Sequence, residues 1–155
     1  MTFKFLGIFA ERSRGLPREC SREWPDADVA KIASPFKSVG VRFSDTLSMP
    51  ENQLPEDIVA AVRGMSAHHP RVKFMILRAE CWGGVCSYWG QTVQGGQTVA
   101  VVDGDQALRR LVQFFGVDIG EKQLFAPLER NFPWTRGNGL MRRIRRLFVA
   151  TSHRR

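Results

Sequence analysis

The sequence has no long apolar run and few cysteines, and both absences limit where the protein can work. No stretch approaches the roughly 20 apolar residues that a membrane-spanning helix needs, so no transmembrane segment is expected. The first ten residues carry Lys4 inside a short apolar stretch and lack the successive zones of a signal peptide. Three cysteines, an odd number, are more typical of a cytoplasmic chain than of a secreted disulfide scaffold. We therefore expect a cytoplasmic protein.

The sequence also lacks the short motifs that identify common enzyme classes. A nucleophile elbow, a Walker loop, a dinucleotide fingerprint, an HExxH motif and an EF-hand loop are all absent. Cys20 and the three histidines offer no second pair of ligands at metal spacing, so we predict neither a metal nor a cofactor. These absences remove every specific argument for an enzyme, although they do not exclude one.

The length and the apolar pattern predict a single α+β domain. A chain of 155 residues can bury a core without help from a metal or a disulfide. Apolar periodicity, prolines and helix-end signals divide the chain into elements. We expect strands over 2–10 and 39–44, a loop over 11–25, a short helix over 26–33, main helices over 55–69 and 105–115, and a short strand over 124–126.

The clearest pattern is a run of three strands in the middle of the chain. The β-rich runs cover 72–82, 85–94 and 97–103, and the pairs Gly83-Gly84 and Gly95-Gly96 separate them. Two-residue Gly-Gly loops favour tight hairpins because both turn positions need positive φ. The pattern predicts a three-stranded antiparallel meander over about 72–103, with the two main helices packed on one face of the sheet.

The first of these hairpins brings two cysteines together. Counting outward from Gly83-Gly84 pairs Cys81 with Cys86 at a non-hydrogen-bonded position, where Cα atoms lie about 4.5 Å apart. That separation is within the range of a disulfide. The alternative is a pair of reduced, partly buried thiols in the cytoplasm.

The same register gathers polar and aromatic residues on one face of the sheet. It pairs Arg78 with Trp89, which allows a cation–π contact, and places Glu80 beside Arg78. This face is a candidate binding surface because exposed tryptophans are common in interfaces. The alternative is an ordinary solvent-facing side of a half-buried sheet. The candidate residues are Arg78, Glu80, Trp82, Ser87, Trp89 and Gln91.

Nearly all the net charge lies at the C-terminus. The formal net charge of the chain is +8. Residues 136–155 contain seven arginines and no acid, so this segment carries +7 of that charge. We predict a domain over 1–134 and a basic amphipathic helical extension over 135–155. The arginines at the centre of its polar side are Arg142, Arg143, Arg145 and Arg146. Residues 140–155 could contact an anionic membrane surface, bind nucleic-acid phosphates, or dock on protein through their apolar side.

Together these patterns indicate a binding protein without catalytic activity. The expected partner is another protein, as for a small bacterial-type inhibitor or immunity module. One alternative is a nucleic-acid-binding accessory protein that uses the arginine-rich extension. A third hypothesis is a small hydrolase-type enzyme that uses Glu80 with Arg78.

Overall fold

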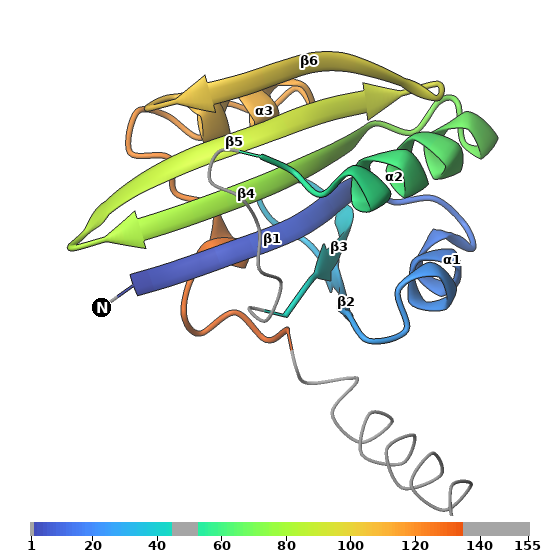
Figure 1. Cartoon of the computed structure of the whole chain (residues 1–155), viewed down its shortest axis with the longest axis horizontal. Helices are drawn as coiled ribbons and strands as arrows, with labels where there is room; N and C mark the ends of the chain where they lie inside the picture. Colours follow the sequence, from blue (N-terminus) through green and yellow to red (C-terminus); the bar gives the residue numbers. More distant parts are fainter. Residues whose placement is uncertain (1, 45–52, 135–155) are drawn as a thin grey trace, which may run out of the picture.

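A six-stranded antiparallel sheet forms the centre of the protein in a computed structural model that describes residues 2–44 and 53–134 (Figure 1). The strands are β1 (Thr2–Glu11), β2 (Asp28–Ile32), β3 (Ser38–Arg42), β4 (Phe74–Trp82), β5 (Val85–Gln94) and β6 (Gln97–Gly104), in the order β2-β3-β1-β4-β5-β6. The helices are α1 (Leu16–Glu23), α2 (Glu56–His68) and α3 (Ala107–Gln113), followed by the 3-10 turn η1 (Ala126–Leu128). The predicted α+β class is confirmed.

The predicted meander is present, but the sheet extends well beyond it. Strands β4, β5 and β6 pair in sequence order, and the second turn, Gly95-Gly96, has the expected positive φ values. The N-terminal strand β1 lies between β3 and β4, so it joins the meander to β2 and β3. The meander therefore makes up half of a six-stranded sheet, with β6 at one edge and β2 at the other.

Three of the expected local elements were wrong. Residues 16–23 form α1 where we expected a loop, because Leu16 and Cys20, one helical turn apart, are both buried against the sheet. Residues 28–32 form β2 where we expected a helix, because they pair along β3. Residues 124–126 do not form a strand, and η1 begins at Ala126. In each case long-range contacts outweigh local propensity.

The two main helices pack on opposite faces of the sheet, which corrects the prediction of a single covered face. Ile58, Val62 and Met65 of α2 join one core, with alternate apolar side chains of β1, β3 and β4. Leu108 and Leu111 of α3 join a second core on the other face. The strands between them are apolar on both sides: every residue of the stretch 74–77 of β4 has no exposed area.

The second core closes with the last residues that the structure describes. Trp134 is buried, its indole N–H donates a hydrogen bond to the Pro127 carbonyl at 2.9 Å, and its ring lies near those of Phe5 and Phe9. Residues up to 134 therefore belong to the packed domain. The extension over 135–155 lies outside the described residues, so its helix and the boundary before it stay predictions.

The Gly83-Gly84 turn produces the predicted register of the β4–β5 hairpin. Both glycines have positive φ, Trp82 pairs with Val85, and each further pair follows in step. Cys81 and Cys86 face each other with Cα atoms 4.0 Å apart and are joined by a disulfide. Cys20 is a buried free thiol. The turn, rather than the disulfide, explains the register, because the glycines alone specify it.

The fold should therefore tolerate loss of the disulfide. We expect the double variant C81S/C86S to unfold cooperatively, with a loss of about 2 kcal/mol because the closed loop is very short. Urea denaturation measured by circular dichroism checks this, and wild-type protein in reductant should behave like the variant. Loss of cooperative unfolding would show that the hairpin depends on the covalent bond.

Packing of α3 on its own face of the sheet can be tested at a glycine. A Cβ added to Gly90 would lie 2.5 Å from the Ile76 carbonyl oxygen and 2.5 Å from Leu111 Cδ1. We expect G90A to destabilise the protein by about 1–3 kcal/mol through overpacking. The matched control is G64A in α2, where an added Cβ meets nothing within 4 Å. That variant should gain about 0.5–1 kcal/mol from helix propensity. Equal stabilities for the two variants would contradict this packing.

Candidate functional site

The candidate residues lie on the α2 side of the sheet, toward the tip of the β4–β5 hairpin. Pairing across the strands places Arg78 opposite Trp89 and Glu80 opposite Ser87. Trp89 in turn pairs with Asp103 of β6, so three strands contribute to one surface. We call this surface the open face and define it by Trp82, Val85, Ser87, Trp89, Val101 and Asp103.

Arg78 lies beneath the open face rather than on it. Its side chain is only 4% exposed and forms an ion pair with Glu80, with Nη2 2.6 Å from Oε1. Its other terminal nitrogen donates to the Gln53 carbonyl at 2.8 Å. The guanidinium carbon lies 5.5 Å from the centre of the Trp89 ring, in the cation–π contact that the register predicts. Arg78 therefore positions Glu80 and Trp89, and it is not available to a partner.

The outer part of the open face is apolar and accessible. The exposed fractions are 62% for Trp82, 72% for Val85 and 70% for Val101, whereas Trp89 is half-buried. A pocket of about 230 Å³ lies beside Trp89, with Leu54, Val101 and Asp103 among its lining residues. Trp82 and Val85 lie at the hairpin tip, whereas Val101 pairs with Gln91, six residues further along β5, so the open face has exposed apolar side chains at two places with Trp89 between them.

The remaining sheet candidates, Gln91 and Ser87, differ in their surroundings. Gln91 is half-buried, and its side-chain oxygen accepts a hydrogen bond from the Thr98 hydroxyl at 3.1 Å. It therefore links β5 to β6, and it also lines the pocket beside Trp89. Ser87 is exposed between the two tryptophans. Arg142, Arg143, Arg145 and Arg146 lie outside the described residues, so the structure does not test them.

The outer edge of β6 is the feature that sequence reasoning missed. Within the part of the chain that the structure describes, no strand pairs with this edge. The consecutive residues Val99, Ala100 and Val101 are all exposed. The opposite edge strand, β2, is shorter, carries Lys31 and contacts α1. Charges and short length are among the usual protections of an edge strand; β6 has eight residues and no charge at its centre, although α2 and α3 contact it from the two faces.

The groups that could carry covalent or metal chemistry are poorly placed for it. Burial raises the pKa of the Cys20 thiol to about 12, so this cysteine is a poor nucleophile near neutral pH. Glu80 is engaged by Arg78 and lines neither the pocket beside Trp89 nor the neighbouring one next to α2. Among the described residues, no group of three His, Cys, Asp or Glu side chains could hold a metal ion.

Comparison with known proteins adds no functional information. No family model, no curated protein and no solved structure matches this chain. Over residues 2–44 and 53–134, no helix combines the length and apolar character needed to cross a bilayer.

The positioning role of the Arg78–Glu80 pair predicts a clear effect on stability. We expect E80A to destabilise the protein by about 3 kcal/mol, because it leaves the buried Arg78 charge without its carboxylate. The matched control is D118A, which breaks the exposed ion pair between Arg109 and Asp118 and should cost much less. Chemical denaturation of both variants checks the difference. Similar losses for the two would contradict the role given to Glu80.

Proposed function

We propose that this protein binds another protein, which adds an extended strand to the edge of β6 and packs side chains on the open face. The observation that carries the proposal is the exposed run from Val99 to Val101 on an edge strand of eight residues. An open edge offers a row of backbone N–H and C=O groups that another strand can pair with. Strand addition would supply main-chain hydrogen bonds, and the neighbouring side chains would supply specificity.

The open face supports this proposal by continuing the same surface. A strand added to β6 places alternate side chains on the α2 side of the sheet, next to Val101 and the pocket beside Trp89. The contact with Arg78 from below holds the Trp89 ring in place before the partner arrives. A rigid aromatic anchor of this kind contributes strongly to binding, because little side-chain entropy is lost on association.

The charges along β6 indicate the chemistry of the partner strand. Asp103 and Asp105 are both exposed at the end of β6 that leads into α3. Arg78 is buried and engaged with Glu80, and the exposed Lys4 lies on β1, three strands away from β6. We therefore expect a segment that combines apolar residues with a basic residue placed opposite Asp103. We propose that this binding takes place in the cytoplasm, where the Cys81–Cys86 disulfide would be reduced and the glycine turn would keep the hairpin register.

A pair of variants tests the proposal. In V99K/V101K, lysines on the edge block strand addition and repel a basic partner segment. The control L124K adds one lysine at an exposed leucine outside β6, in the segment between α3 and η1, and the single variants V99K and V101K match its change of charge. We expect wild-type protein and L124K to capture the same partner from an extract of the source cells, in the presence of nuclease, and V99K/V101K to lose it.

Three results would contradict this function. Capture that all three proteins share equally would place the binding surface elsewhere. Capture that nuclease abolishes would favour nucleic-acid binding through residues 140–155, which stays a prediction from sequence. Size-exclusion chromatography with light scattering could instead show a dimer of wild-type protein that V99K/V101K disrupts and L124K does not. The strand added at β6 would then come from a second copy of this chain.

A further inference from the structure

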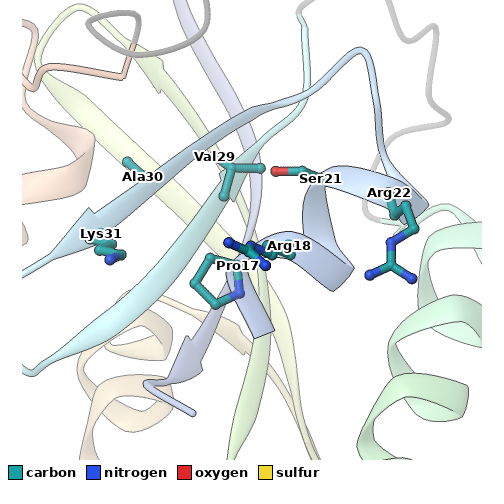
Figure 2. A pocket seen from close by; sticks show the side chains of 7 residues that line it. All are labelled: Pro17, Arg18, Ser21, Arg22, Val29, Ala30 and Lys31. Atoms are coloured by element: carbon teal, nitrogen blue, oxygen red, sulfur yellow. The ribbon is translucent and has the colours of Figure 1, made fainter. Parts of the chain in front are cut away.

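A basic groove lies between α1 and β2, at the edge of the sheet opposite β6. The groove has a volume of about 380 Å³. Its lining combines three cations, one hydroxyl and three apolar side chains: Arg18, Arg22, Lys31, Ser21, Pro17, Val29 and Ala30. In Figure 2 the Arg18 guanidinium and the Ser21 hydroxyl point from α1 toward β2, whereas Arg22 extends away from Lys31.

The charges of α1 are sorted by sign around the helix. At about 100° per residue, Arg18, Ser21 and Arg22 lie along one side of α1. Glu19 and Glu23 lie along the other side, and Glu19 contacts His69 at the end of α2, with 2.6 Å between Oε2 and Nε2. The groove is therefore lined by cations without an acid among them.

Three of the other described arginines are paired with a carboxylate, whereas the cations of this groove, like the exposed Arg71 and Arg110, are not. Arg42, Arg78 and Arg109 each form an ion pair with a carboxylate. Among the described residues, no ion pair or hydrogen bond involves the side chains of Arg18, Arg22 or Lys31. Like charges gathered in one groove repel each other, and a bound anion would turn that repulsion into attraction.

The lining also restricts the kind of anion. The volume lies within the range of small-molecule sites, which is larger than a lone inorganic anion needs. Pro17 and Val29 provide apolar walls beside the charges. Arg18 and Lys31 together suit a doubly charged group better than a single carboxylate, and a hydroxyl can donate to a phosphoryl oxygen.

We propose that this groove binds a phosphate ester of about mononucleotide size. Its phosphoryl oxygens lie between Arg18, Lys31 and the Ser21 hydroxyl, and its organic part lies against Pro17 and Val29. The site is separate from the β6 edge, so it stands or falls independently of strand addition. Adenosine monophosphate, inorganic phosphate and adenosine are suitable probes because they separate the charge from the organic part.

Titration of the full-length protein by NMR, at low salt, tests the site. We expect adenosine monophosphate to bind saturably and to shift the amide signals of Ser21 and Val29. It should bind about tenfold more tightly than inorganic phosphate, since its organic part buries apolar surface, and adenosine alone should show no saturation.

Matched variants complete the test. R18Q/K31Q should weaken adenosine monophosphate binding on the order of 100-fold, through loss of two charge-assisted contacts. R71Q/R110Q removes the same charge at exposed positions outside the groove and should keep the affinity within about twofold. Absence of saturable binding overturns the proposal. Equal affinity for phosphate and the nucleotide, or equal weakening in both double variants, overturns it as well.

Discussion

Burial of the central strands on both faces is the constraint on which the rest of this structure depends. In β4, every residue from Phe74 to Ala79 is buried, and the neighbouring strand β1 is buried from Phe5 to Ala10. Strands of this kind need cover on each side, because neither face can be left to water. Helices α1 and α2 supply it on one side, and α3 with the segment up to Trp134 supplies it on the other. The placement of helices on both faces therefore follows from the apolar character of the central strands.

The extent of this helical cover also explains why part of the α2 side of the sheet stays open. Helix α2 contacts β4, β5 and β6 near the Gly95-Gly96 turn, and α3, only seven residues long, contacts β5 and β6 on the other face. On the α2 side this cover leaves the tip of the β4–β5 hairpin and Val101 of β6 exposed. The surface that remains there has exposed apolar side chains. Beneath it, the buried Arg78 contacts Glu80 and Trp89. Both features fit a preformed interaction surface better than a catalytic cleft.

Much of the fold could be predicted because its signals are local. The Gly83-Gly84 pair alone specifies the hairpin register, including the contact between Arg78 and Trp89. The rest depends on contacts between distant residues. The place of β1 between β3 and β4 makes β6 an edge strand, and no pattern within β6 reports that. Burial of Arg78 escaped prediction because Gln53, 25 positions earlier in the chain, covers it. Helix α1 escaped because its buried side consists of only two residues, Leu16 and Cys20.

Hydrogen exchange at the backbone amides of β6 tests the central claim most directly. In the free protein, the amides of β6 that point away from β5 should exchange far faster than those of β4, which is paired on both sides. The partner to add is the one that wild-type protein captures and V99K/V101K loses. It should slow exchange of these amides at least about tenfold, because they become hydrogen-bonded to the added strand. Outward-pointing β6 amides that already exchange slowly in the free protein, or that stay fast in the complex, would contradict strand addition at this edge.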